Sequence, residues 1–358
     1  MALLIDGGRV PPRWAEKKGP DSARFQGRHD SGAECVKIAL INNMPDAALE
    51  DTEMQFMELL DAASCDIPVR LKLYCLPGIP RADRGRKHLN NFYSSISDLW
   101  DSRVDAVIMT GTEPRQPDLR EEPYWHPLTD VLDWAERNTV STVLSCLAAH
   151  AGVLHSDNIR RQPLDDKLFG VFESAAVLDH QLTSHAGRPI LFPHSRWNEV
   201  REHSLMECGY SILTRSAQAG ADLFAKQKKK SLFVYFQGHP EYSARTLLKE
   251  YRRDIKRFMR HERETYPAMP FGYFDNGTTR LLAEFQQTAL LHQQEERMAF
   301  FPEAIAADSL HNRWQSSAAC VYRNWLLHVL LRKNERSTFV AFAQDGRGPS
   351  IVTSNELA

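Results

Sequence analysis

Short apolar runs that alternate with helical patterns are the feature that most restricts the fold of this chain. The runs have the length of buried strands and lie at residues 36–41, 69–76, 105–109 and 140–145. Apolar residues at helical spacing follow at 52–60 and 127–137. This alternation predicts an α/β fold, a mostly parallel sheet flanked by helices. Because ligands bind beyond the carboxyl ends of strands in such sheets, we expect the turns after Ile41, Met109 and Ser145 to converge on one site.

The remaining segments suggest how the chain is divided. Residues 1–34 are rich in Gly, Pro and basic residues without lasting periodicity, which is typical of a flexible arm. In the second half, a hairpin is expected around residues 228–230, and helices over 244–260, 278–298 and 318–331. We therefore predict a flexible arm (1–34), a catalytic domain (35–276), a helical C-terminal extension (277–333) and a disordered tail (334–358).

Charge and cysteine usage exclude several classes of protein. The 44 Lys and Arg against 46 Asp and Glu leave a formal charge of -2, which does not suit a dedicated nucleic-acid binder. No apolar run approaches the roughly 20 residues that span a bilayer, and no signal-peptide pattern opens the chain. The six cysteines lack metal-ligand or disulfide spacing. We expect a cytoplasmic protein with reduced thiols, no metal, and no nucleic-acid or membrane partner.

Cys146 differs from the other cysteines in its position. It lies where the apolar run 140–145 turns into a helix of small residues. A side chain at such a turn is exposed above the sheet, and the helix dipole favours the thiolate there. The backbone N–H of Leu147 is a candidate oxyanion donor. A small core residue at a strand end remains the alternative interpretation.

His239 and Glu241 form a second candidate feature, directly after the strand expected at residues 232–236. A carboxylate two residues from a histidine can hold the imidazole in one tautomer while its other nitrogen faces a nucleophile. Alone this pattern is weak. Together with a strand-end cysteine it predicts a triad in which Cys146 is the nucleophile, His239 the base and Glu241 the residue that orients the base.

The chain resembles the homoserine O-acyltransferases of methionine biosynthesis, a family built on a class I glutamine-amidotransferase-like (flavodoxin-like) fold. The resemblance runs in order over residues 36–274 and a C-terminal helix. Its motifs are Ile41-Asn42-Asn43-Met44-Pro45, Thr52-Glu53, His88-Leu89-Asn90-Asn91-Phe92-Tyr93, Thr110-Gly111, Tyr124-Trp125, Cys146, Lys167-Leu168, Pro193-His194-Ser195-Arg196, Gly238–Tyr242, Glu250-Tyr251 with Arg253, and Asn324-Trp325-Leu326.

The resemblance implies a ping-pong reaction. Cys146 would take an acyl group from acyl-CoA as a thioester and pass it to the hydroxyl of homoserine, with succinyl as the expected acyl group. Lys167, Ser195 and Arg253 match substrate-binding positions, although solvation, a turn cap or a surface ion pair also remains open for them. The resemblance further implies acyl-CoA as a co-substrate rather than a bound cofactor, small-molecule partners only, and a homodimer.

The loop after Thr110-Gly111 departs from the family. In the family a residue there helps to select the acyl donor, with glycine accompanying succinyl and glutamate accompanying acetyl. Arg115 aligns with this position, and its guanidinium could pair with the free carboxylate of a succinyl group. Glu113, two residues away, is the alternative occupant.

Four functions therefore stay open. The first is homoserine O-succinyltransferase, with the acetyltransferase as its variant. The second is acylation of a related amino acid such as serine. The third is a glutamine-amidotransferase-type hydrolase, against which Ser145-Cys146-Leu147 lacks the glycines that usually flank that nucleophile. The fourth is a non-catalytic relative, against which the presence of the three triad residues argues.

Overall fold

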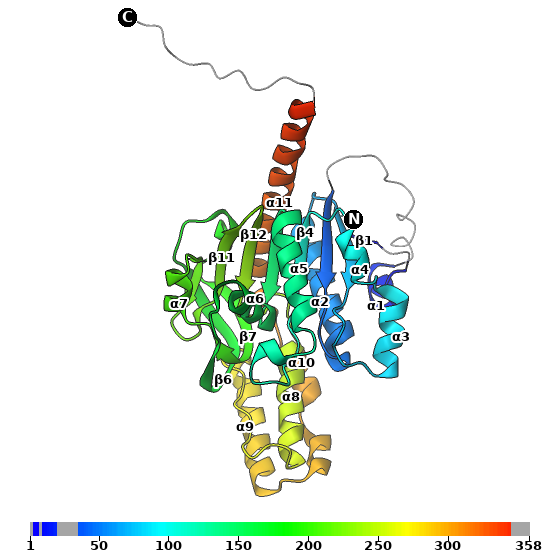
Figure 1. The fold of residues 1–358 in the computed structure, drawn as a ribbon. Helices are drawn as coiled ribbons and strands as arrows, with labels where there is room; N and C mark the ends of the chain where they lie inside the picture. Colours follow the sequence, from blue (N-terminus) through cyan, green and yellow to red (C-terminus); the bar gives the residue numbers. More distant parts are fainter. Residues whose placement is uncertain (1–2, 7–8, 20–34, 345–358) are drawn as a thin grey trace, which may run out of the picture.

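The main sheet of the protein has eight strands in the order β1-β3-β2-β4-β5-β12-β11-β8. The computed structural model describes residues 3–6, 9–19 and 35–344, with side chains as far as residue 336 (Figure 1). The strands of this sheet are β1 (Leu3–Asp6), β2 (Val36–Ile41), β3 (Val69–Tyr74), β4 (Ala106–Met109), β5 (Ser141–Ser145), β8 (Ser211–Ile212), β11 (Leu223–Lys228) and β12 (Ser231–Phe236).

Pairing in this sheet is parallel from β1 to β12. Only the edge formed by β11 and β8 is antiparallel. The mostly parallel α/β fold predicted from the sequence is thus confirmed, and so is the hairpin around Lys228–Lys230, which joins β11 to β12.

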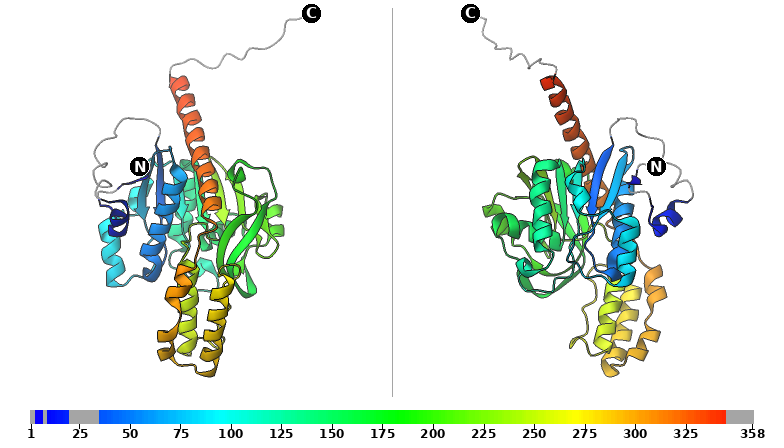
Figure 2. Two further views of the ribbon diagram at one scale, coloured as in Figure 1. Left: turned by 180° about the vertical axis from the view of Figure 1, so that it is seen from behind. Right: turned by 45° about the vertical axis from the view of Figure 1, so that its right-hand side comes forward.

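Helices cover both faces of the main sheet. In Figure 1, α5 (Trp125–Asn138) and α6 (Leu147–Asp157) lie in front of it. The rear view in Figure 2 shows α2 (Asp46–Ser64) and α11 (Gln315–Gln344) on the opposite face. Two separate apolar clusters fill the two interfaces, so strands buried on both sides carry apolar residues at nearly every position. Three shorter helices, α3 (Asp83–Phe92), α4 (Ser97–Trp100) and α7 (Glu202–Glu207), pack at the periphery.

A second sheet of four antiparallel strands has the order β10-β9-β6-β7. Its strands are β6 (Gln162–Ala176), β7 (Ile190–Glu199), β9 (Thr214–Ser216) and β10 (Gly220–Ala221). The sequence did not predict this sheet, and Lys167 lies in its strand β6.

A helical lobe extends from the carboxyl side of the main sheet, at the bottom of Figure 1. It contains α8 (Thr246–Met259), α9 (Asn276–Leu291) and α10 (Glu303–Asp308) around a third apolar cluster. Because α8 and α9 share this cluster, the boundary predicted at residue 276 does not separate two independently packed units. No helix among the described residues is long and apolar enough to cross a membrane.

Both predicted ends of the chain need correction. The arm expected over residues 1–34 includes β1, which pairs in parallel with β3, and α1 (Pro12–Lys18), whose Trp14 is buried against the core. Three apolar residues in β1 were too few to reveal a strand. At the other end α11 continues to Gln344, beyond the tail boundary predicted at residue 334. Residues 20–34 and 345–358 lie outside the described residues.

Candidate active site

Cys146 occupies the turn between β5 and α6 in a backbone conformation that is rare for a residue with a side chain. Its φ is 53° and its ψ is -113°. Its N–H donates to the carbonyl of Phe236 in the neighbouring strand β12 (2.8 Å), and its carbonyl accepts the N–H groups of Ala149 and His150. The turn is therefore fixed from both sides and leaves the Cys146 side chain partly exposed at the N-terminus of α6.

The turn after β4 lies against the turn that carries Cys146. A Cβ placed on Gly111 would lie 2.6 Å from the Cβ of Leu147 and 2.9 Å from its backbone nitrogen. Any larger residue at position 111 would crowd the N–H that we predict as an oxyanion donor. Glycine is therefore required here by the close approach of two backbones rather than by φ.

The turn after β2 joins the same edge. The N–H of Asn43 donates to Thr110 Oγ1 (2.8 Å), and Asn43 Nδ2 donates to the Thr110 carbonyl (3.1 Å). The expected convergence of the turns after Ile41, Met109 and Ser145 on one site is thus confirmed.

His239 contacts both of its predicted partners. Its Nδ1 lies 2.9 Å from Glu241 Oε1, and both side chains are buried. Ser145 Oγ donates to the same oxygen of Glu241 (3.3 Å). Burial alone would lower the pKa of His239. The negative charge of Cys146 and the carboxylate of Glu241, each within hydrogen-bonding contact, outweigh that effect and raise the pKa well above its usual value. The arrangement favours the protonated form of His239.

A buried polar network holds the backbone that carries His239. The N–H of Gly238 donates to Asp222 Oδ1 (2.8 Å), and the other oxygen of Asp222 lies 3.4 Å from His194 Nε2. Both side chains are completely buried. The N–H of His239 donates to the carbonyl of Pro193 (2.8 Å). Contacts from strand β7 and from Asp222, the residue before β11, thus fix the position of the loop that carries the imidazole.

Gln237 connects the same loop to the helix that Cys146 begins. Its Oε1 accepts the N–H of Val200 (2.8 Å) and lies 3.1 Å from Nε2 of His150, one turn beyond Cys146 in α6. Burial, with a smaller contribution from the charge of Arg196, lowers the pKa of His150 to about 3, so the ring is neutral near pH 7. A neutral ring can donate from Nε2 to the amide oxygen.

The three predicted substrate-binding residues lie around two carboxylates of α8. Lys167 Nζ contacts Glu250 Oε2 (3.3 Å) and Asp254 Oδ2 (3.1 Å). Ser195 Oγ donates to Glu250 Oε2. Arg253 pairs with Asp254 Oδ1 (3.0 Å), while half of its side chain remains exposed. The structure thus brings Lys167, Ser195 and Arg253 together, and Arg253 also forms the surface ion pair with Glu250 that was the alternative interpretation. Their role in substrate binding stays a prediction.

Tyr242 links this cluster to the predicted triad. Its ring stacks on the imidazole of His239, and its hydroxyl donates to Glu250 Oε1 (2.8 Å). No role for Tyr242, Glu250 or Asp254 was predicted from the sequence. Glu250 and Asp254 are four residues apart in α8, a spacing that puts both carboxylates on one face of the helix and could have indicated their common role. Nothing in the local sequence indicated that Tyr242 would contact them.

The two predicted donor-selecting residues lie on an exposed loop, and their side chains do not contact Cys146. The loop is held by Glu122, a buried carboxylate that accepts the N–H groups of Arg115 and Gln116. The side chains of Arg115 and Glu113 are exposed. Glu113 lies within electrostatic range of Arg253. The role predicted for this loop in donor selection stays a prediction, and nothing in the sequence indicated that Glu122 holds the loop.

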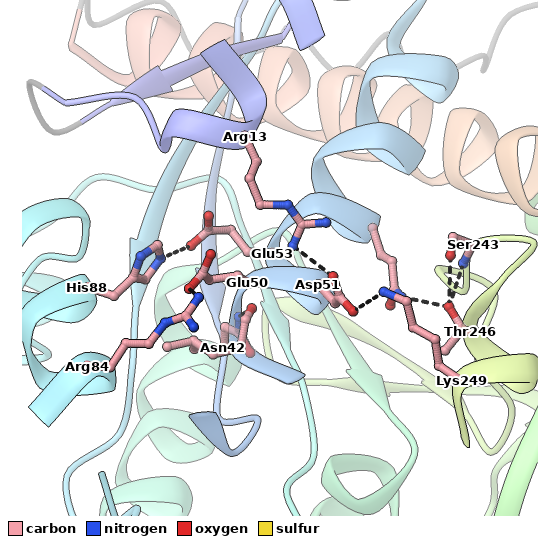
Figure 3. Close-up of polar contacts among 12 residues, drawn as sticks. Arg13, Asn42, Glu50, Asp51, Glu53, Arg84, His88, Ser243, Thr246 and Lys249 are labelled. Carbon is pink, nitrogen blue, oxygen red and sulfur yellow. Dashed lines mark hydrogen bonds and ion pairs between the residues drawn. The ribbon is translucent and has the colours of Figure 1, made fainter. Parts of the chain in front are cut away.

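Helix α2 connects the sheet edge to α1, α3 and α8 through polar side chains (Figure 3). Glu53 Oε2 lies 2.9 Å from His88 Nε2; Glu53 is buried and His88 is partly buried. Asp51 pairs with Arg13 of α1 (2.7 Å) and with Lys249 of α8 (2.6 Å). These contacts hold α8, and with it Glu250 and Arg253, beside the carboxyl edge of the main sheet. Among the described residues no group of His, Cys, Asp and Glu has the arrangement of a metal site.

Comparisons with known proteins identify close relatives. A family model described as homoserine O-succinyltransferase matches residues 25–336. A protein of Rhodopseudomonas palustris named homoserine O-succinyltransferase is 43% identical over 331 residues, which is 92% of this chain and 99% of that protein. One of the same name from Bradyrhizobium japonicum is 41% identical, over 91% of this chain and 98% of that protein. A solved glutamine amido transferase from Methylobacillus flagellatus is 12% identical, with a TM-score of 0.42, over 82% of this chain and 95% of that one.

Proposed function

The chain belongs to the homoserine O-succinyltransferase family and is therefore an acyltransferase, and we propose that it moves the succinyl group of succinyl-CoA to the hydroxyl of L-homoserine through a thioester on Cys146. The observation that carries this proposal is the position of Cys146, on a strained turn at the start of α6 and in contact with the His239–Glu241 pair.

In the first half of the reaction, the Cys146 sulfur attacks the carbonyl carbon of the acyl-CoA thioester. A carbon–sulfur bond forms, and the oxygen of the tetrahedral intermediate becomes negative beside the N–H of Leu147. The intermediate collapses as the bond to the CoA sulfur breaks, and protonated His239 donates its proton to that sulfur. CoA leaves as a thiol, while Cys146 carries the acyl group.

In the second half, neutral His239 accepts the proton of the homoserine hydroxyl as that oxygen attacks the Cys146 thioester. The new carbon–oxygen bond replaces the carbon–sulfur bond, and the sulfur leaves with its negative charge beside the imidazolium. Glu241 bonds Nδ1 throughout, so Nε2 is the nitrogen that exchanges the proton.

The charged side chains around Glu250 and Asp254 of α8 complement the charges of an amino acid. Arg253 has an exposed guanidinium that suits the α-carboxylate, and Glu250 and Asp254 offer negative charge to the ammonium group. Because Tyr242 connects Glu250 to His239, an amino acid bound there would place its side-chain hydroxyl near the base.

The test is the intact mass of the protein after mixing with equal amounts of succinyl-CoA and acetyl-CoA, without acceptor. We expect a succinyl increment that is absent from Cys146→Ala and unchanged in Cys208→Ala, a control at another partly buried thiol. An increment that survives in Cys146→Ala would refute the thioester route. An acetyl increment would keep the route and refute the donor assignment. Adding homoserine or serine to the acylated protein then identifies the acceptor, and faster discharge by serine would refute homoserine.

A further inference from the structure

Arg161 is a half-buried cation near Cys146 that makes no hydrogen bond and no ion pair with the residues the structure describes. Its guanidinium lies within electrostatic range of Cys146, Glu122 and Tyr124. Burial lowers its pKa, against the effect of these negatively charged or ionisable neighbours. A half-buried guanidinium without a protein acceptor keeps its N–H donors available to water or to a bound anion.

The backbone brings Arg161 to this position from the far end of α6. Asn158, in the left-handed conformation with φ 54°, ends the helix and reverses the chain. There the ring of His155 contacts that of Trp125, with centroids 6.2 Å apart, so the end of α6 lies against the start of α5. Glu122 and Tyr124 directly precede α5, and β6 begins directly after Arg161.

Arg161 also adjoins the donor loop through Glu122. This carboxylate holds the backbone of Arg115 and Gln116, and the same loop begins at Gly111, which packs on Leu147. The guanidinium of Arg161 therefore lies in the region where the donor loop and the turn of Cys146 meet.

The other cations of this region already have acceptors. Arg196 is also within electrostatic range of Cys146, but it donates to His194 Nδ1 and to the carbonyls of Asn198 and Ala219. Lys167 and Arg253 are bound by the carboxylates of α8. Within the described part of the chain, Arg161 is the cation near Cys146 that can receive a new anion without breaking a bond.

We propose that Arg161 binds the terminal carboxylate of the succinyl group carried on Cys146, and that this contact selects succinyl over acetyl. The inference rests on the proposed thioester route. Two methylene groups separate the thioester carbonyl from that carboxylate, so the cation that binds it must lie near the sulfur but beyond hydrogen-bond distance from it. Guanidinium pairs with carboxylate through two parallel hydrogen bonds, and an acetyl group offers no such partner.

The experiment measures the rate of Cys146 acylation by intact mass, with succinyl-CoA and acetyl-CoA supplied separately. We expect Arg161→Gln to slow succinylation about tenfold or more and to leave acetylation within about twofold, because only succinyl loses a charged hydrogen bond. Arg161→Lys should retain part of the preference as a point charge. The matched control is Arg160→Gln, which removes the same charge from an exposed neighbour.

Arg115→Gln is the competing variant. If it, rather than Arg161→Gln, removes the preference for succinyl, the donor loop holds the carboxylate and the inference is overturned. An equal slowing of both donors in Arg161→Gln would overturn it as well, since that result marks a structural role. These outcomes all require wild-type protein that is acylated on Cys146. Wild-type protein that takes up neither donor would instead refute the proposed function.

Discussion

The imidazole of His239 and the ring of Tyr242 lie face to face, with centroids 4.2 Å apart and planes inclined by 17°. The hydroxyl of Tyr242 donates to Glu250, the carboxylate that also accepts from Lys167 and Ser195. One side chain thus connects the base to the group of residues that we expect to bind the acceptor. The ring contacts His239 and the hydroxyl contacts Glu250, so a mutation can remove one contact and keep the other.

Replacing Tyr242 with Phe should impair the acceptor half of the reaction alone. The ring remains to stack on His239, while Glu250 loses a hydrogen bond to a charged group, which corresponds to roughly a tenfold weaker interaction. We expect the KM for homoserine to rise by up to about that factor, and acylation of Cys146 by succinyl-CoA to keep its rate. Tyr242→Ala, which also removes the stacked ring, should slow both steps. Equal slowing of both steps by Tyr242→Phe would contradict this separation.

Replacing Asp222 with Asn should lower kcat more than it raises KM. The amide oxygen can still accept the N–H of Gly238, but the negative charge near His194 is lost, and the buried Arg196 nearby loses its counter-charge. The loop that bears His239 then shifts, or the protonation equilibrium of His239 changes. We expect kcat to fall about tenfold or more. Steady-state kinetics with a pH profile provide the measurement. Asp133→Asn, which breaks an exposed pair with His155, is the control. A pH profile identical to wild type would show that Asp222 only supports folding.

His150 should make stability depend on pH in acid. An unfolded histidine binds a proton below about pH 6.5, whereas the pKa of buried His150 is about 3. Between these values the unfolded state holds one more proton, so stability falls as the pH falls, by about 1.4 kcal/mol per pH unit. Urea unfolding at pH 7 and pH 5 should therefore show about 2 kcal/mol more loss in wild type than in His150→Gln. The exposed His203→Gln is expected to behave as wild type, and a wild-type loss equal to that of His150→Gln would disprove the assignment.

Trp14 should stabilise the protein although it lies in the segment predicted to be flexible. Its side chain is 2% exposed and belongs to the same apolar cluster as Leu60 of α2 and Leu3 of β1. We expect Trp14→Ala to lower the free energy of unfolding by about 3 kcal/mol. Arg13→Ala, which breaks an ion pair at the surface, should cost less than about 1 kcal/mol. Similar losses from the two variants would indicate that α1 is not docked.

The main sheet could be predicted because its strands are buried on both faces. The strand 141–145 is a short run of apolar and small residues, every one of them buried, and its length between two helical patterns favours a strand. The second sheet gave no such signal. Strand β6 has one exposed half with Pro163, Asp165 and Asp166, and its pairing with β7 is interrupted by a bulge.

Local and distant contacts differ in the same way at the candidate site. The contact between His239 and Glu241 is encoded within three residues, and the position of Cys146 follows from the end of one strand. Contacts such as Gly238 to Asp222 join residues from different elements, and only the folded sheet brings them together. Arg161 was overlooked for the same reason, because its distance from Cys146 depends on how α6 ends.

Under the proposed thioester route, the conformation of Cys146 also makes activity and stability conflict at a single position. A residue with a Cβ at φ 53° and ψ -113° stores strain of about 1–3 kcal/mol, which the surrounding hydrogen bonds sustain. Glycine would relieve that strain and remove the nucleophile at the same time. Selection for acyl transfer therefore maintains a permanent local instability at this turn, and a lineage released from that selection would become more stable by losing its thiol.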